Sequence, residues 1–294
     1  MTNEDPKDKY ERASHYANLR RAVRDGKRER GEIPTPAPQK WQKQGGGDWK
    51  PPQLQPEQVF LYGLHTVRAA LDNRERKIIN LSVTQNAFAR LDIGEADALS
   101  YPVEFVSPQA IDKILGPDAI HQGVMLETRP LPVRRLEALK ESPLLLVLDQ
   151  VTDPHNVGAI MRSAVAFGAG AVITTQRHSP TESGVLAKSA SGALELIPYI
   201  QVTNLSDAIS ELHRLGFQTI GLDSDGPAQL EGTFSGERIA LVLGSEGKGL
   251  RQKTRETVNT LARLDMPGEI KSLNVSNAAA IALYASHQHI SKKA

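Results

Sequence analysis

The sequence predicts an α/β protein whose C-terminal half is built on a parallel sheet. The run LLLVLD at residues 144–149 is almost entirely aliphatic, as expected for a strand buried on both faces of such a sheet. Strand-like and helix-like runs alternate after it, which is typical of repeated β-loop-α units. Two strand-like runs stop at loops of small residues, LVLGSEGKGL at 241–250 and LDMPGEIKSLN at 264–274. Ligands of open α/β sheets bind beside such loops, so we expect one pocket there.

The composition of the 294 residues allows about two domains and excludes several kinds of site. There is no cysteine, so disulfides, thiolate zinc sites and a cysteine nucleophile are excluded. A net charge of +1 means that contact with nucleic acid must depend on local basic patches. No apolar run approaches the ~20 residues of a membrane span, and the N-terminus lacks the apolar core of a signal peptide. We therefore expect a cytoplasmic protein that does not enter a membrane.

Residues 1–56 are predicted to be a disordered tail, because they contain few large aliphatic side chains. A basic stretch, NLRRAVRDGKRERGE, precedes a linker rich in Pro, Gly and Gln. One interpretation is a solvated tail. The other is an arm whose basic side chains meet RNA phosphates while Trp41 or Trp49 stacks on bases. The basic side chains in question are Arg20, Arg21, Arg24, Lys27, Arg28 and Arg30.

Residues 57–128 are predicted to form a small α/β domain, since strands and helices alternate along them. VFLYGLHTVRAALDN predicts a strand and then a helix, and INLSVT predicts a second strand. We expect a helix from about Ala87 to Leu99, a strand at VEFV, a helix from Pro108 to Leu115 and a strand in HQGVMLET. His65 and His121 stand close to glycines, but a lone histidine is more often structural than a ligand, and we assign neither to a metal.

A linker at 129–142, with Pro130 and Pro132, leads into a second α/β domain at 143–294. The first strand of this domain is followed by a predicted helix from about Asn156 to Phe167. Arg162 lies off the apolar stripe of this helix, which leaves its charge free to face a ligand. The stripe that should pack on the sheet consists of Val157, Ile160, Met161, Ala164 and Val165.

The loop GSEGKGL does not fit the common nucleotide-binding motifs. Lys248 is followed by Gly249, whereas a P-loop requires Ser or Thr there. The GxGxxG fingerprint is also absent, and it belongs to the first βα unit rather than to a late loop. Glu246 is an acid between glycines at a strand end, where neither a core nor solubility requires it, so we regard it as functional.

Other polar residues have ordinary explanations. Asp149 ends a strand and Asp153-Pro154 is a common turn pair, so no metal site is expected from these residues and His155. Ser272, beside Asn274, could cap the following helix, and this role does not exclude contact with a ligand.

Three ordered motifs resemble those of the SpoU (TrmH-type) RNA ribose 2′-O-methyltransferases: DPHNVGAIMRSA, LVLGSEGKGL and MPGEIKSLNVSNAAAIAL. The likeness covers residues 143–290. YGLHTVRAAL and HQGVMLE resemble the family's substrate-binding domain, which is similar to ribosomal protein L30e. Asp265 stands where the family usually has proline, and Asn277 replaces a usual aliphatic residue, but the polar set is intact.

The resemblance implies a SPOUT α/β sheet with a C-terminal trefoil knot that binds S-adenosylmethionine. It also implies a homodimer whose active site is completed across the interface, with structured RNA as partner and no metal. The Ala-rich run at 278–285 suits close helix packing at such an interface. Cofactor contacts of the family fall on Leu243, Gly244, Leu264 and Leu273. Its active-site positions fall on Asn156, Arg162, Glu246, Ser272 and Asn274.

The implied reaction is methyl transfer from S-adenosylmethionine to a ribose 2′-hydroxyl. Family proposals make the residue at Arg162 the base, but a guanidinium is protonated far above neutral pH. We prefer that Arg162 grips the neighbouring phosphate and polarises the hydroxyl, while a phosphate oxygen or water accepts the proton. Asn156 and Glu246 would position Arg162 and the ribose, and Ser272 and Asn274 would shape the pocket floor.

Guanosine of 23S rRNA is the favoured substrate, because the small domain and the spacing look most like the bacterial rRNA enzyme of this family. A tRNA ribose is the alternative within the class. A catalytically silent RNA-binding or ribosome-assembly protein on the same fold is the alternative outside it, and a cofactor-binding assay would separate the two. A nucleotide-dependent oxidoreductase is disfavoured by the missing fingerprint.

Removing residues 1–56 should leave the melting temperature nearly unchanged and weaken RNA affinity, more so at low salt, because the segment is basic and poor in aliphatic side chains. Thermal melting and RNA titration of the truncated chain test this. A large loss of thermal stability would instead show that the segment packs on the core.

Overall fold

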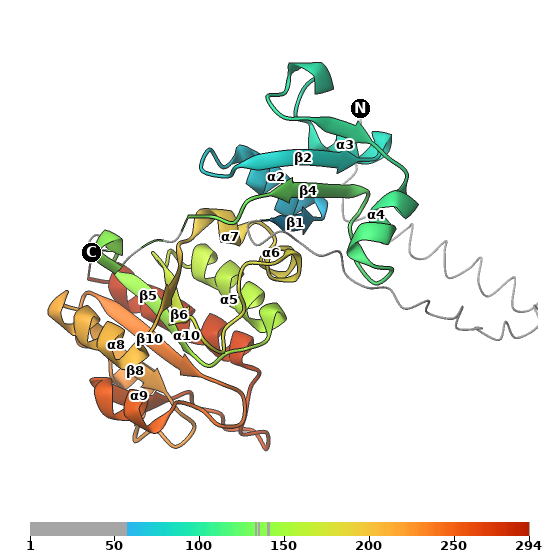
Figure 1. Cartoon of the computed structure of the whole chain (residues 1–294). Coiled ribbons are helices and arrows are strands. Elements are labelled where there is room, and N and C mark those ends of the chain that lie inside the picture. The colour runs from blue at the N-terminus through green and yellow to red at the C-terminus, as the bar shows by residue number, and fades with distance from the viewer. Residues whose placement is uncertain (1–57, 133, 135, 140–141, 294) are drawn as a thin grey trace, which may run out of the picture. The chain divides into compact units, whose positions relative to one another are not determined.

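A computed structural model describes residues 58–132, 134, 136–139 and 142–293 of the chain. The sequence-based expectations for the tail at 1–56 lie outside this part. Two sheets make up the fold, and each can be followed in Figure 1. Among the described residues, no helix is long and apolar enough to cross a membrane.

The first sheet has four strands, and its central strand β4 is antiparallel to both neighbours. In sheet order the strands are β1 (Val59–Tyr62), β4 (Val124–Thr128), β2 (Ile78–Val83) and β3 (Val103–Phe105). Its helices are α2 (Leu64–Asp72), α3 (Gln85–Leu91) and α4 (Pro108–Leu115), with a 3₁₀ turn at Ala96–Ala98.

The helix expected from Ala87 to Leu99 is wrong in its second half, because α3 ends at Leu91. Asp92 adopts a left-handed backbone with φ 51°, and Gly94 follows with φ 87°. A positive φ ends a right-handed helix, and only the short 3₁₀ turn at Ala96–Ala98 follows. The expected small α/β unit is otherwise present.

The second sheet has seven strands, and every pair of neighbours in it is parallel. The predicted parallel sheet is therefore confirmed. In sheet order the strands are β7 (Tyr199–Val202), β6 (Val172–Thr175), β5 (Leu144–Asp149), β10 (Ile239–Gly244), β8 (Gln218–Leu222), β11 (Thr260–Arg263) and β9 (Ala228–Gln229). The helices are α5 (Pro154–Ala166), α6 (Gly184–Ala190), α7 (Ala193–Leu196), α8 (Leu205–Arg214), α9 (Gln252–Thr257) and α10 (Val275–Ser291), with 3₁₀ turns at Leu136–Leu139 and Leu230–Gly232.

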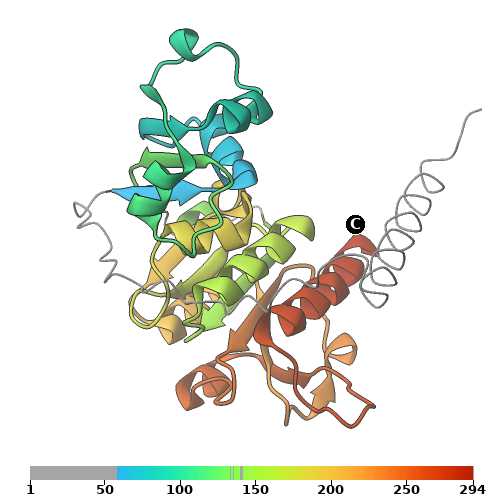
Figure 2. The same cartoon turned by 90° about the vertical axis from the view of Figure 1, so that its right-hand side faces the viewer.

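The central strands β5 and β10 are buried on both faces, as their aliphatic sequences require. Leu146 of β5 and Leu241 of β10 belong to the core beneath α5 and α10. Their neighbours Val147 and Val242 belong to the core beneath α8. Alternate side chains of one strand thus hold helices on opposite faces, and Figure 2 shows α5 and α10 side by side.

Two expectations for the second sheet need adjustment. The strand before the last loop is Thr260–Arg263, so it ends before Leu264 instead of starting there. Helices α6 and α7 and strand β7, which lie between residues 184 and 202, were also not predicted from the sequence. Their run GVLAKSASGALEL consists largely of small residues and therefore has little of the apolar periodicity that marks a helix.

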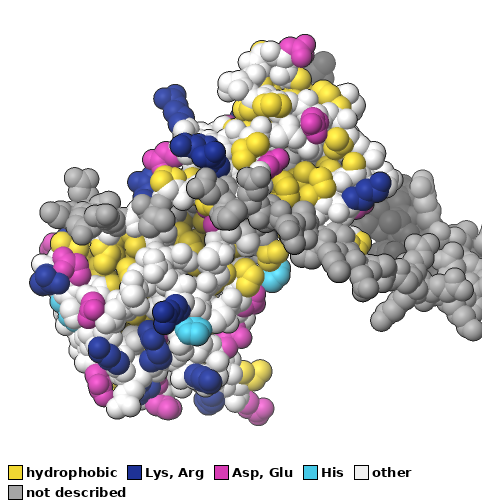
Figure 3. All heavy atoms as spheres, in the orientation of Figure 1, with side chains coloured by type: hydrophobic (Ala, Val, Ile, Leu, Met, Phe, Trp, Pro, Cys, Tyr) yellow, Lys and Arg dark blue, Asp and Glu magenta, His cyan; other side chains and the backbone are white. Residues whose placement is uncertain are grey.

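Charge is mixed on the surface, in keeping with the net charge of +1. On the face drawn in Figure 3, Lys and Arg side chains of the described residues are interspersed with Asp and Glu. Attraction of a polyanion must therefore depend on particular side chains rather than on one extended basic field.

Candidate active site

The glycine-rich loop after β10 folds back over the end of its own strand. The amide of Gly249 donates to the carbonyl oxygen of Ser245 at 2.9 Å, which closes the loop. A Cβ placed on Gly244 would lie 2.1 Å from the carbonyl carbon of Gly249, much closer than any side chain can approach backbone. Gly247 and Gly249 have positive φ values of 79° and 64°. Close approach at Gly244 and left-handed backbone at the other two explain why the loop needs glycine.

A buried carboxylate fixes where this loop ends. Asp149, the last residue of β5, lies beside Gly244 in the parallel register and is fully buried. Its carboxylate accepts hydrogen bonds from the backbone amide of Arg251 at 3.0 Å and from Arg251 Nε at 2.6 Å. Asp149 therefore has a structural partner. A second candidate ligand, Asp153, caps α5 by accepting from the amide of His155 at 2.9 Å. The described residues contain no group of side chains that could hold a metal ion.

Glu246 is the centre of a cluster that joins three distant segments. Its Oε1 accepts hydrogen bonds from Asn156 Nδ2 at 3.0 Å, from Asn274 Nδ2 at 2.7 Å and from the backbone amide of Val275 at 3.3 Å. Asn274 Nδ2 also donates to Asn156 Oδ1 at 3.0 Å. None of these hydrogen bonds reaches Oε2 of Glu246, although the cluster is open to solvent. This oxygen is therefore free to accept a hydrogen bond from a ligand.

Asn274 places this cluster at the start of α10. Its Oδ1 accepts from the amide of Ser276 at 2.8 Å, so Asn274 is the N-cap residue and Ser272 is not. The capping role weighed for Ser272 is thus wrong, because the helix begins at Val275 and Ser272 lies in the preceding loop. The helix N-terminus also favours a negative group, which suits the carboxylate of Glu246.

A cavity of about 380 Å³ lies against the same two loops. Its lining includes all four leucine and glycine positions that the sequence analysis assigned to the cofactor, and also Glu246 and Ser272. The four positions are Leu243, Gly244, Leu264 and Leu273. Pockets of ~300–1,000 Å³ with mostly apolar walls and few polar groups are typical small-molecule sites.

The lining fits S-adenosylmethionine in size and in chemistry. Leucine side chains suit a flat adenine, exposed loop backbone suits its polar edge, and carboxylates suit a positively charged sulfonium. Asp223 and Arg255 face each other as an ion pair at the wall of the cavity, and neither was predicted from the sequence. Asp223 directly follows β8, so its position at a strand end was the signal that could have revealed it.

Arg162 lies on α5 but not within this cluster. It comes six positions after Asn156, which places it about 9 Å further along the helix and about a third of a turn around it. It is exposed and makes no hydrogen bond or ion pair with any residue that the structure describes. The structure thus brings Asn156, Glu246 and Asn274 together, with Ser272 nearby at the cavity, and leaves Arg162 apart.

Comparison with known proteins gives consistent matches along the chain. Residues 143–284 match the SpoU rRNA Methylase family, and residues 60–133 match the family described as RNA 2′-O ribose methyltransferase substrate binding. The 23S rRNA (guanosine-2′-O-)-methyltransferase RlmB of Ralstonia nicotianae is 39% identical over 76% of this chain and 93% of its own length. The protein of the same name from Coxiella burnetii is 37% identical over the same shares of both chains.

Solved structures share the fold at lower identity. The SpoU methyltransferase AviRb from Streptomyces viridochromogenes, in complex with AdoMet, aligns with a TM-score of 0.68 at 21% identity and covers 79% of this chain and 90% of its own. An AdoMet-bound rRNA methyltransferase from Sinorhizobium meliloti aligns with a TM-score of 0.67 at 24% identity, over 80% and 88%. These likenesses concern the fold.

Gly244→Ala should lower stability by about 2 kcal/mol, because a Cβ there collides with the returning loop backbone and not only with a ligand. Cofactor affinity should fall with it, since the displaced loop lines the cavity. Thermal melting and titration calorimetry measure both effects.

The matched control is Gly268→Ala, in the neighbouring loop, where a Cβ meets nothing within 4 Å. It should change stability by less than about 0.5 kcal/mol. Wild-type stability and cofactor affinity in Gly244→Ala would contradict the close approach described here.

Proposed function

Because the chain belongs to the SpoU rRNA methylase family, we propose that it transfers a methyl group from S-adenosylmethionine to the 2′-hydroxyl of a guanosine ribose in 23S rRNA. The observation that best supports this function is that a carboxylate cluster lies beside a cavity of suitable size for the methyl donor. The carboxylate cluster of Glu246 stands at the wall of the cavity that Leu243, Gly244, Leu264 and Leu273 line. A methyl donor in that cavity has a polar acceptor cluster beside it.

S-adenosylmethionine supplies an activated methyl group on a sulfonium, so the protein's task is to place the hydroxyl and manage its proton. Oε1 of Glu246 is occupied by Asn156, Asn274 and the amide of Val275. Oε2 is the oxygen that orients a ribose hydroxyl or a guanidinium. Asn156 and Asn274 act on the substrate through Glu246, because their amide groups hold its carboxylate in one orientation. Ser272 lines the cavity from the loop before α10 and shapes its floor.

Arg162 provides the positive charge of the reaction. A guanidinium remains protonated at neutral pH, so it serves as a donor to the RNA phosphate and to the ribose hydroxyl rather than as a base. A phosphate oxygen or a water molecule then accepts the hydroxyl proton. The exposure of Arg162 and its lack of a partner among the described residues support this role, since none of those residues competes for the charge.

The site is completed by a second copy of the chain. Two observations support a homodimer. Arg162 lies about 9 Å along α5 from Asn156, and no hydrogen bond or ion pair joins it to the Glu246 cluster among the described residues of one chain. The outer face of α10 also carries Ile281 and Tyr284, which are 45% and 54% exposed. Covering these side chains would remove apolar surface from water, and a two-fold arrangement would bring Arg162 of one copy to Glu246 of the other.

The finer features of the family extend this proposal. The trefoil knot would be formed by the last strands and α10, and membership of the SpoU family is what supports it. The four-stranded sheet is the L30e-like RNA-binding unit, a role that the substrate-binding family match supports. The proposed compartment is the cytoplasm, where bacteria such as those of the relatives named above make their rRNA. A tRNA substrate and a silent assembly role are weaker alternatives, because the curated relatives named above act on 23S rRNA guanosine.

The substrate can be tested by mapping ribose methylation across total RNA from a strain that lacks this protein. We expect the loss of one methylated guanosine in 23S rRNA, and its return when the chain is supplied again. Loss of a tRNA methylation instead would transfer the function to the alternative substrate, and an unchanged map would contradict methyl transfer.

Arg162→Ala should reduce single-turnover methylation of RNA by about 100-fold or more, because it removes a charged donor needed in the transition state. Arg162→Lys should keep part of the activity, since a lysine supplies the charge without the two-pronged geometry. Cofactor affinity, measured by calorimetry, should be unchanged in both variants, because Arg162 does not line the cavity.

The control is Arg177→Ala, which removes another exposed arginine from the loop after β6 and should leave the rate near that of the wild type. A wild-type rate for Arg162→Ala would show that Arg162 has no catalytic role. A fully active Arg162→Lys whose rate rises through the lysine titration range would show that the residue is a base.

A further inference from the structure

A fully buried arginine joins the small sheet to the large one. Arg76 lies between α2 and β2, and its side chain has 0% exposure. One terminal nitrogen pairs with Glu182, in the loop before α6, and the other pairs with Glu195 of α7. Nε of Arg76 also donates to Glu195 Oε2 at 3.2 Å, so the contact with Glu195 is two-pronged.

The same network holds the start of the linker. Arg76 Nη1 donates to the carbonyl oxygen of Arg129 at 3.0 Å, and the second oxygen of Glu182 accepts from the amide of Leu131 at 2.8 Å. Asn73 Nδ2 donates to Glu195 Oε2 at 2.8 Å. Both carboxylates and the guanidinium are thus hydrogen-bonded at the point where the chain passes from one sheet to the other.

The surrounding contacts leave little room for the two sheets to shift. A Cβ on Gly184 would lie 2.4 Å from the carbonyl oxygen of Phe60, and a Cβ on Gly192 would lie 2.9 Å from Ala69 Cβ. Thr66 Oγ1 donates to the carbonyl oxygen of Ala187 at 3.3 Å. One hydrophobic cluster includes side chains of both sheets. The small sheet and its helix α2 therefore pack against α6 and α7, in addition to being connected through the linker.

Helix α6 lies between the small sheet and the candidate active site. A Cβ on Gly158 of α5 would lie 2.5 Å from Ser189 Cβ of α6, so the two helices touch closely. Ser189 Oγ is also 3.0 Å from Nδ1 of His155, the residue before Asn156. The small sheet, α6 and the N-terminal end of α5 thus form one continuous packed path to the Glu246 cluster.

A buried ion pair contributes little to the free energy of unfolding. Removing charges from water costs several kcal/mol per ion, and apolar side chains of similar size often serve as well or better. A buried charge network that requires fixed geometry is better suited to specifying one arrangement of the parts that it joins.

We propose that Arg76 is a positioning residue which, through Glu182 and Glu195, holds the substrate-binding unit in one orientation and so fixes which ribose of the bound RNA reaches the methyl donor. This inference rests on the proposed function. RNA bound to the small sheet is held at a set distance from the cavity. If the orientation of the small sheet varied, neighbouring riboses could also reach the methyl donor. Loss of the network should therefore impair productive binding and choice of nucleotide more than the chemical step.

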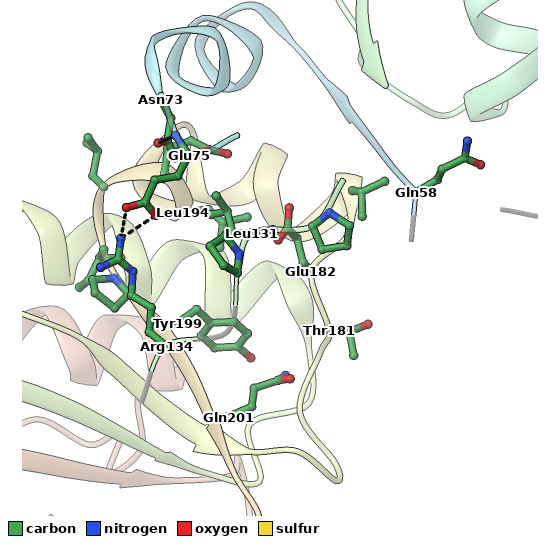
Figure 4. A pocket seen from close by; sticks show the side chains of 17 residues that line it. Gln58, Asn73, Glu75, Leu131, Arg134, Thr181, Glu182, Leu194, Tyr199 and Gln201 are labelled. Carbon is green, nitrogen blue, oxygen red and sulfur yellow. Dashed lines mark hydrogen bonds and ion pairs between the residues drawn. The ribbon is translucent and has the colours of Figure 1, made fainter. Parts of the chain in front are cut away.

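A second ion pair at the same junction provides a matched control. Glu75 and Arg134 are 2.7 Å apart at a cavity of about 700 Å³, which Figure 4 shows with Glu182 in its wall. Their side chains are 50% and 45% exposed, and exposed pairs contribute little. Glu75→Gln should leave orientation and nucleotide choice unchanged.

Orientation can be measured directly, because the chain has no cysteine of its own. Gln109→Cys on α4 and Lys253→Cys on α9, both exposed positions, would carry spin labels on the two sheets. The full chain, mixed with an excess of unlabelled chain so that a dimer carries at most one labelled copy, should give one narrow distance distribution. The triple variant Arg76→Met, Glu182→Gln, Glu195→Gln removes the network without stranding a buried charge and should give a broad distribution. If the triple variant does not fold, Glu195→Gln alone takes its place.

Methylation of a long 23S rRNA fragment supplies the second readout. The network variant should show KM raised by about tenfold with kcat within about threefold, and methyl groups on riboses beside the target. S-adenosylmethionine affinity should match the wild type. A folded network variant with a narrow distance distribution, wild-type KM and methylation at the target alone would overturn the proposal, as would a broad distribution in the wild-type chain. Absence of methylation by the wild type would overturn the proposed function instead, while the spin-label distances would still decide the role of Arg76.

Discussion

The carboxylate of Glu246 is the point at which three distant parts of the chain become one site. Its Oε1 binds Asn156 from the start of α5, Asn274 from the cap of α10 and the amide of Val275. A carboxylate at a helix N-terminus is favoured by the free amide groups there, so the arrangement stabilises itself. The glycine loop delivers Glu246 to this place only because Gly244 lets backbone pass within contact of its own strand, and because Asp149 holds the loop's end at Arg251. These contacts set one wall of the cavity beside the glycine loop and leave Oε2 of Glu246 free to accept a hydrogen bond.

Much of this framework could be predicted from the sequence, because it depends on local pattern. The aliphatic run at 144–149 indicated a buried parallel strand, and the spacing of apolar residues on α5 put Arg162 off the buried face. Glu246 was expected to be functional because neither a core nor solubility requires an acid among glycines at a strand end. The resemblance supplied the cofactor positions, and the structure places all four around one cavity.

Other features depend on pairings that no local pattern reveals. Arg76 stands among Asn73, Arg74, Glu75 and Lys77, where it reads as a solvated turn residue, yet it is buried because Glu182 and Glu195 approach from over a hundred residues away. The cap of α10 falls on Asn274 rather than Ser272 because the helix starts where Glu246 can accept from Val275. Gly244 was expected only as a cofactor contact, and the structure adds that the space a side chain would need there is taken by Gly249 and Leu250. Small-residue helices such as α6 are missed for a similar reason, since their sequence is set by what lies against them.

We propose that Arg162 of one copy and Glu246 of a second copy together make one complete site, because no hydrogen bond or ion pair joins the two residues within the described part of one chain. This proposal is tested by co-expressing differently tagged Arg162→Ala and Glu246→Ala chains and isolating the mixed dimer through both tags. Each variant alone should be nearly inactive. In the mixed dimer, one site combines the intact Arg162 of one chain with the intact Glu246 of the other, so methyl transfer should return to about half of the wild-type rate. A mixed dimer as inactive as the two parents, or a chain that stays monomeric while fully active, would contradict a site shared between two copies of the chain.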